Sequence, residues 1–104
     1  MAYDRVITAC DRAELAERER GASWLQTFHD ETIRAQAILV ELSAGLAMNH
    51  ASSDVVALSR QLDSLYRYAM DELVKANTQK SADPIAAVRL VIDGLRDAWV
   101  TAAR

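Results

Sequence analysis

The chain has 104 residues and a formal net charge of −3, with three glycines, one proline and one cysteine. This length suits a single domain with its own hydrophobic core, and the scarcity of glycine and proline favours long helices over strands. The basic residues are interleaved with Asp and Glu, so the sequence argues against a nucleic-acid partner.

The cellular location is constrained by what the sequence lacks. No apolar run approaches the roughly 20 residues that a bilayer-spanning helix needs. The single cysteine, Cys10, cannot close an internal disulfide, and no leading apolar segment with a cleavage signature is present. We therefore expect a cytoplasmic protein that does not insert into membranes.

Residues 3–20 predict a first helix with a narrow apolar face. Val6, Cys10 and Ala13 share one side, and most other positions are charged. Such a face suits the close approach of a neighbouring helix. Gly21 is expected to end this helix, and Ser23 to cap the next one.

Residues 24–48 predict a second helix with two apolar lines. The line expected to face the core consists of Trp24, Leu25, Phe28, Ala35, Ile38, Leu39, Leu42 and Leu46. The opposite line consists of Ile33, Ala37, Val40 and Ala44. A globular helix usually carries charges on that opposite side. The second line is therefore either covered by another helix of the same bundle or a docking surface, and the sequence leaves both readings open.

Residues 54–77 predict a third helix, capped by Ser53 or Asp54, that is apolar over more of its girth than one core contact needs. The set expected to face the core consists of Val55, Leu58, Leu62, Leu65, Ala69, Leu73 and Ala76. A second set, rotated around the helix, consists of Val56, Tyr66, Met70 and Val74. We expect this surplus apolar surface to meet a partner.

Residues 84–103 predict a fourth helix, with Pro84 in its first turn and Asp83 as its cap. Its core face consists of Ile85, Val88, Ile92, Leu95 and Trp99, and Leu90 lies on the other side. Short loops make consecutive helices neighbours. We therefore predict a single all-α domain, residues 1–104, folded as an antiparallel up-down four-helix bundle.

The sequence offers no constellation of catalytic or metal-binding residues. Neither His29 nor His50 stands at the Glu-x-x-His spacing of di-iron bundles, and His29 lies among acids that would repel a phosphoryl group. Cys10, on a predicted core face, is interpreted as a small hydrophobe rather than a nucleophile. No glycine-rich loop is present to cradle phosphate. We predict a binding protein without a cofactor, not an enzyme.

Motifs in three of the predicted helices resemble those of one family. The run IRAQAILVEL at 33–42, followed by Leu46, is similar to Ile-x-x-Ala-Gln-x-Ile-Ile-x-Glu-Leu. Residues 62–77 are similar to Leu-x-x-Leu-Tyr-x-Tyr-Met followed by Leu and Ala-Asn, and residues 95–99 to a closing Leu-Arg-x-Ala-Trp. Together these motifs resemble the flagellar secretion chaperones of the FliS type, cytosolic helical bundles that bind flagellin before its export.

The resemblance implies a partner, the C-terminal segment of flagellin. This segment is disordered alone and folds as an amphipathic helix in a groove of the chaperone, which prevents premature polymerisation before type III flagellar secretion. We assign the groove to the surplus apolar residues of the second and third helices, namely Ile33, Ala37, Val40, Ala44, Val56, Tyr66, Met70 and Val74. A flagellar export-gate protein is a further candidate partner. The alternative is a homodimeric helical-bundle protein with no flagellin client.

The N-terminal end departs from the family pattern. MAYDRVI at 1–7 resembles the family's Met-Leu-Tyr-Asp-Gly-Ala-Ile. The family's usual N-terminal leader, which lies over the client groove, has no counterpart before Met1. We therefore do not assume that this chain covers its own groove.

Overall fold

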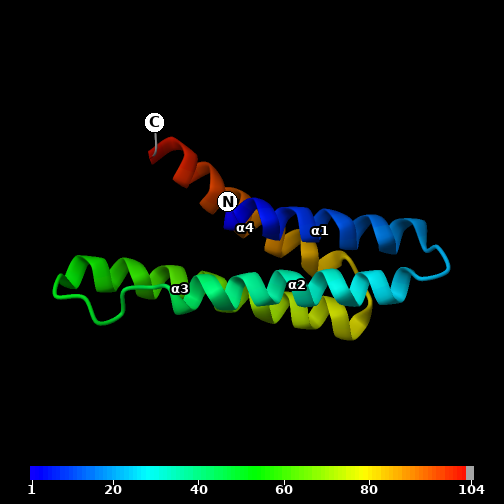
Figure 1. Cartoon of the computed structure of the whole chain (residues 1–104), viewed down its shortest axis with the longest axis horizontal. Helices are drawn as coiled ribbons and strands as arrows, with labels where there is room; N and C mark the ends of the chain where they lie inside the picture. The colour runs from blue at the N-terminus through cyan, green and yellow to red at the C-terminus, as the bar shows by residue number, and fades with distance from the viewer. Residues whose placement is uncertain (103–104) are drawn as a thin grey trace.

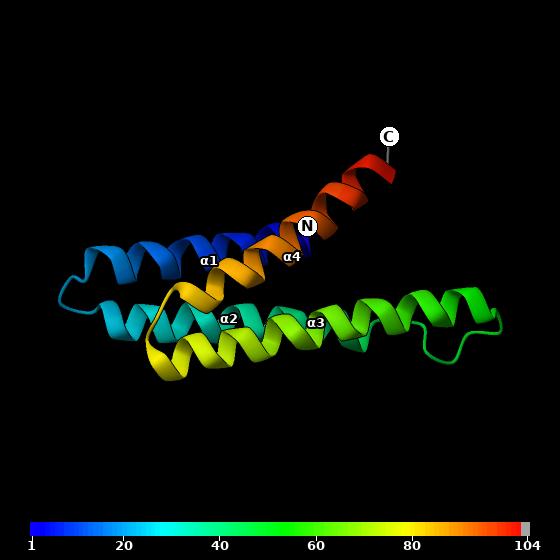
Figure 2. The ribbon, with the colours of Figure 1, turned by 180° about the vertical axis from the view of Figure 1, so that it is seen from behind.

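The computed structural model describes residues 1–102 and consists of four helices. Helix α1 spans Ala2–Glu19, α2 spans Trp24–Ala44, α3 spans Ser53–Gln79 and α4 spans Asp83–Ala102. The α1–α2 pair lies in front of α3 and α4 in Figure 1, and Figure 2 shows the two pairs from the opposite side. The predicted end of the fourth helix at residue 103 lies outside the described residues.

Each helix packs against two others around a closed ring. The backbones of α1 and α2, α2 and α3, α3 and α4, and α4 and α1 lie side by side, and across the ring Tyr3 of α1 reaches Tyr66 of α3 through their side chains. The chain reverses direction at every connection, as Figure 2 shows. The predicted antiparallel up-down four-helix bundle is confirmed.

Helix α2 ends at Ala44, four residues before the predicted end at position 48. Gly45 donates its N–H to the carbonyls of Glu41 and Leu42 at 3.2 and 3.3 Å, and Leu46 N–H donates to Ser43 O at 3.2 Å. These bonds tighten the last turn, and glycine is a poor residue for continuing a helix. Residues 45–52 therefore form a longer connection than predicted.

Two helices end on charged residues in the left-handed conformation. Arg20 has φ 48° and donates its N–H to Ala16 O, and Lys80 has φ 50° and donates to Ala76 O. We expected Gly21 to end the first helix, but the residue before it takes the left-handed position.

At the start of α3, Ser52 accepts a hydrogen bond from Val55 N–H at 3.4 Å, one residue before the predicted caps.

The core draws buried apolar residues from all four helices. They are Val6, Ala9, Cys10 and Ala13 of α1, Phe28, Ala35, Ile38 and Leu39 of α2, Tyr66, Ala69, Leu73 and Ala76 of α3, and Ile85, Val88 and Ile92 of α4. On α3 this face lies between the two apolar sets that the sequence separates. Leu25, Leu58, Leu65 and Trp99, predicted to face the core, are exposed instead.

These exposed residues on α3 and α4 share a structural cause. Figure 2 shows the first turns of α3 running past the end of α2, and the last turns of α4 leaning away from the other helices. Leu58 and Leu65 lie on the first half of α3, and Trp99 lies near the end of α4 with 61% of its surface exposed. We call this region the open end of the bundle, because fewer helices overlap there.

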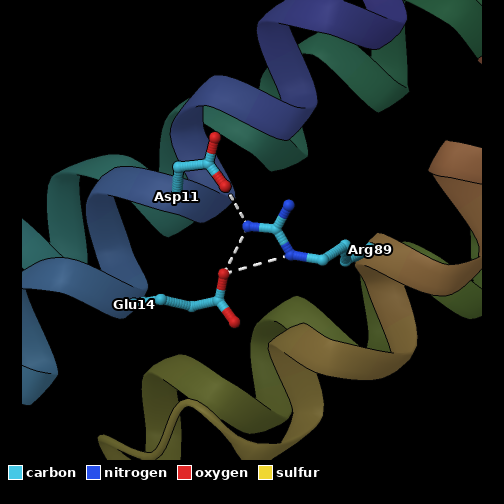
Figure 3. A network of polar contacts seen from close by, with 3 residues as sticks. All are labelled: Asp11, Glu14 and Arg89. Carbon is cyan, nitrogen blue, oxygen red and sulfur yellow. Dashed lines mark hydrogen bonds and ion pairs between the residues drawn. The ribbon is translucent and has the colours of Figure 1, made fainter.

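A polar network fastens α4 to α1. The Arg89 guanidinium of α4 donates to carboxylates of both Asp11 and Glu14 on α1, and its Nε lies 3.2 Å from Glu14 Oε1 (Figure 3). Hydrogen bonding to Glu14, and then to Asp11, raises the pKa of Arg89. Arg96 donates to Asp4 farther along the same pair of helices. Charged contacts thus hold α4 against the small-residue helix α1.

Candidate binding surface

The second apolar line of α2 faces solvent. Ile33 is 44% exposed and Val40 is 56% exposed, and Ala37 and Ala44 are exposed on the same side. We call these four residues the outer strip. None of the other described helices covers this strip, so it is apolar surface available to a partner.

Two polar contacts fix the register between α2 and α3. Ser43 Oγ donates to Asp63 Oδ1, and His29 Nδ1 lies 3.1 Å from Asn77 Nδ2. His29 and Ser43 are fourteen positions apart on α2, and their partners Asn77 and Asp63 are fourteen positions apart on α3 in the opposite order, as expected for antiparallel helices. Each step forward along α2 therefore corresponds to one step back along α3.

The residues between these two contacts form one seam. On α2 the spacing four, three, four, three gives His29, Ile33, Gln36, Val40 and Ser43. On α3 the same spacing gives Asp63, Arg67, Met70, Val74 and Asn77. At about 100° per residue each set follows one side of its helix. We call this the α2–α3 seam.

The seam places apolar residues between polar ends. Ile33 lies level with Val74, which is 51% exposed, and Gln36 lies level with the half-buried Met70. Val40 lies level with Arg67. The structure therefore brings Ile33, Val40, Met70 and Val74 together from two helices, beside the rest of the outer strip.

A charged pair stands at one end of the seam. Asp63 accepts hydrogen bonds from Arg67 Nε at 2.7 Å and from Ser43 Oγ. The hydrogen bond from Arg67, and then that from Ser43, hold the pKa of Asp63 below its ordinary value. The carboxylate is therefore ionised at neutral pH, and the seam pairs an apolar stretch with fixed, oriented charges that can set the register of a bound helix.

Tyr66, one of the eight predicted groove residues, lies in the core. Its ring is 3% exposed, and its hydroxyl lies 2.6 Å from that of Tyr3. Burial and the bond to Tyr3 raise its pKa. The ring does border a cavity of about 400 Å³ at the open end, which Leu42, Leu62 and Trp99 also line. Tyr66 is thus a structural residue of the bundle beneath that cavity.

Val56, another predicted groove residue, lies away from the seam. It is half-buried and lines a different cavity with His50 and Arg60. It precedes Val74 by eighteen positions on the same helix, a separation of about 27 Å at the usual helical rise. A single short helix on the seam would not reach it.

The open end adds apolar surface that sequence reasoning assigned to the core. Leu58 and Leu65 of α3 are exposed there, as is Trp99 of α4. Their spacing is that of a core face, so periodicity alone could not show them to be exposed. Gly45 was the available signal for Leu58, because α2 ends at Ala44, level with the start of the Asp63 turn, and leaves the earlier residues of α3 without that neighbour.

The described residues offer few groups suited to metal binding or nucleophilic catalysis. Within them no cluster of three or more His, Cys, Asp or Glu side chains could hold a metal ion. Cys10 is buried, and burial raises its pKa to about 12, so the thiol is protonated at neutral pH. No helix in residues 1–102 combines the length and the apolar character needed to cross a bilayer.

Comparison with known families gives one match. A family model described as "FliS: Flagellar protein FliS" matches residues 1–104, the whole chain. Comparison with curated proteins and with solved structures gave no match.

Proposed function

We propose, from the premise that this chain belongs to the FliS family of flagellar proteins, that it binds the C-terminal helical segment of flagellin and keeps it competent for type III secretion. The family is one of non-enzymatic chaperones, and membership implies a role in flagellin export. We place the client on the α2–α3 seam and the outer strip beside it. Such a chaperone works in the cytoplasm, before the client reaches the export apparatus.

The observation that supports this proposal most directly is the exposed apolar strip of α2 beside the α2–α3 seam. An amphipathic helix laid along the seam would cover Ile33, Val40 and Val74 and touch Met70. Methionine adapts its shape to different neighbours, which suits a client helix of variable side chains. Helix-in-groove binding of this kind needs apolar anchors and no catalytic group.

The energetics allow useful affinity. Covering three large, half-exposed side chains contributes about 0.7 to 1.5 kcal/mol each, since full burial is worth about 1.5 to 3 kcal/mol. Folding of a disordered client takes back roughly 2 to 5 kcal/mol, so the client must also supply apolar contacts elsewhere on the bundle. The open end, with Leu58, Leu65 and Trp99, provides such surface for a segment that wraps around the protein.

The proposed mechanism is steric and stoichiometric. While the client helix lies on the chaperone, its apolar face cannot meet another flagellin, so polymerisation is blocked until the client is handed on. An export-gate protein is the natural receiver in this scheme. No bond is made or broken at any stage.

The test is a charge placed in the seam. Val40→Glu should weaken binding of a flagellin C-terminal peptide at least tenfold, because a carboxylate would be buried against an apolar client face. Leu90→Glu is the matched control, since Leu90 is 77% exposed on α4 and outside the seam. Calorimetric titration gives both affinities, and circular dichroism should show unchanged helix content in both variants.

Two results would contradict the assignment. The first is wild-type affinity for Val40→Glu, and the second is an equal loss for Leu90→Glu. Tyr66→Asp is unsuitable as a test, because a charge at this buried position would damage the fold whether or not a client binds.

A homodimer without a client is the alternative function, and the same exposed apolar strip would form its interface. Light scattering with and without excess peptide separates the two readings. A chaperone exchanges self-association for the client, whereas an obligate dimer keeps its mass when peptide is added.

A further inference from the structure

A second groove, made of two cavities, lies between α1 and α2. Figure 1 shows these two helices in front of α3 and α4. Two cavities of about 470 and 300 Å³ follow one another along it and share Arg12 in their walls. Arg5, Thr8 and Arg34 also line the larger cavity. The smaller one is lined by Leu15, Ala16 and Trp24, among others. The groove therefore has an arginine-rich end and an apolar end.

The arginines of this groove are poorly paired within the protein. No carboxylate among residues 1–102 lies within 4 Å of the guanidinium of Arg5 or Arg12, whereas Arg67, Arg89 and Arg96 each have a close carboxylate. Arg34 Nε lies 3.9 Å from Glu31 Oε2, too far for a hydrogen bond, and that buried oxygen has no other partner. Three arginines thus line one cavity, and only Arg34 has a carboxylate within 4 Å, in a chain of net charge −3.

The acidic residues near the groove do not cancel this charge. Asp4 lines the larger cavity but already accepts a hydrogen bond from Arg96 of α4. Glu19 lies at the other end, beside the apolar cavity. The middle of the groove, around Arg5, Arg12 and Arg34, is therefore positively charged and open to solvent.

We infer that the α1–α2 groove binds an acidic amphipathic helix of a second protein partner. Arg5 and Arg12 are seven positions apart on one face of α1, so they fit two carboxylates two turns apart, about 10.5 Å along the axis. Leu15 and Ala16 follow Arg12 by about one more turn. A matching helix therefore carries an apolar residue one turn beyond its second carboxylate.

The shape of the groove favours a helical peptide over nucleic acid. A phosphate backbone requires positive charge along its whole path, and half of this groove is apolar. None of the residues of the α2–α3 seam lines this groove, because the seam lies on the other side of α2. The two surfaces can be occupied independently.

The experiment uses the full chain and a designed, fluorescently labelled helical peptide. The peptide presents Glu at two positions seven apart and Leu one turn farther, and its counterpart has Gln in place of both Glu residues. We expect the acidic peptide to bind at least tenfold more tightly than the Gln peptide by fluorescence anisotropy. Added salt should reduce this difference, because the contacts are exposed ion pairs.

Arg12→Glu is the decisive variant, and Arg60→Glu is its matched control. Both residues are exposed, lie within helices and lack a close carboxylate among the described residues, but Arg60 is on α3 away from the groove. We expect Arg12→Glu to abolish the preference for the acidic peptide and Arg60→Glu to keep it. Arg12→Gln should give an intermediate loss.

Several results would overturn the inference. Equal effects of Arg12→Glu and Arg60→Glu would mean that only net charge matters. Equal affinity for the acidic and Gln peptides would mean that the groove does not recognise carboxylates. Displacement of the acidic peptide by a single-stranded oligonucleotide at similar concentration would assign the groove to nucleic acid, and loss of a homodimer in Arg12→Glu would assign it to a second copy. Flagellin peptide binding, measured on the same variants, should be unchanged by Arg12→Glu, so this inference and the proposed function can fail separately.

Discussion

Helices α1 and α3 each end on a residue whose backbone conformation suits glycine better than the side chain present. Lys80 has φ 50° and ψ 47°, and in this region an L-residue with a β-carbon costs about 1 to 2 kcal/mol relative to right-handed backbone. The conformation persists because Lys80 N–H completes the end of α3 by donating to Ala76 O. The Lys80 ammonium also lies 5.9 Å from the centre of the Phe28 ring, which offsets part of the strain.

Lys80→Gly should therefore stabilise the protein, by about 0.5 kcal/mol after the lost aromatic contact is counted. Lys75→Gly, the same chemical change inside α3, should destabilise it by about 1 kcal/mol. Urea unfolding followed by circular dichroism measures both free energies. A loss of stability in both variants would show that the left-handed position carries no strain.

At the scale of helices, an ion pair stabilises the fold more when it connects two helices than when it lies within one. Arg89 joins α4 to two carboxylates of α1 and is only 29% exposed, whereas Arg67 pairs with Asp63 within α3 and is 70% exposed. An exposed pair within one helix is worth little, because solvent screens it. A partly buried arginine that satisfies two carboxylates between helices is worth more, since its loss leaves both without a partner.

Arg89→Met should lower the free energy of unfolding by about 1 to 2 kcal/mol, and Arg67→Met by less than about 0.5 kcal/mol. Adding Glu14→Gln to Arg89→Met should recover part of the loss, because one unpaired carboxylate is removed. Urea titrations of the three variants at one salt concentration provide the comparison. Equal losses for Arg89 and Arg67 would show that the α1–α4 network is no stronger than a surface pair.

At the scale of the whole molecule, the buried core thins out toward the start of α3 and the end of α4. The buried residues of α3 start at Ser59 and continue from Tyr66 to Ala76, and those of α4 stop at Ile92. Leu58 precedes these residues on α3, Leu65 lies between Ser59 and Tyr66, and Trp99 follows Ile92, and all three are exposed. Packing among the buried residues from Tyr66 to Ala76 and from Pro84 to Ile92 holds the bundle together, which leaves apolar residues at the open end free for a partner.

Ile92→Ala should cost about 2 to 5 kcal/mol, because it empties a fully buried site. Trp99→Ala, on the same helix and with a larger side chain, should cost less than about 1 kcal/mol, since most of the ring is already in water. Thermal and urea unfolding measure both. A Trp99→Ala loss as large as that of Ile92→Ala would mean that the end of α4 packs against the bundle.

Much of the fold could be predicted from the chain alone. Four amphipathic segments joined by short loops determine an up-down bundle, and the buried faces Val6–Cys10–Ala13 and Ile85–Val88–Ile92 follow from helical periodicity. The exposure of the α2 line could be predicted only as one of two alternatives, and the structure decides for solvent. The assignment of that line to a client stays a prediction.

Other features were decided by the tertiary structure. Periodicity relates residues on one helix to each other, but it does not say where the neighbouring helices end or on which side they lie. The core face of α3 is therefore centred on Tyr66, Ala69 and Leu73 rather than on Leu58 and Leu65, because α2 stops short of Leu58 and the end of α4 leans away (Figure 2). The same limit explains the α1–α2 groove, since Arg5, Arg12 and Arg34 come together only when two helices pack side by side.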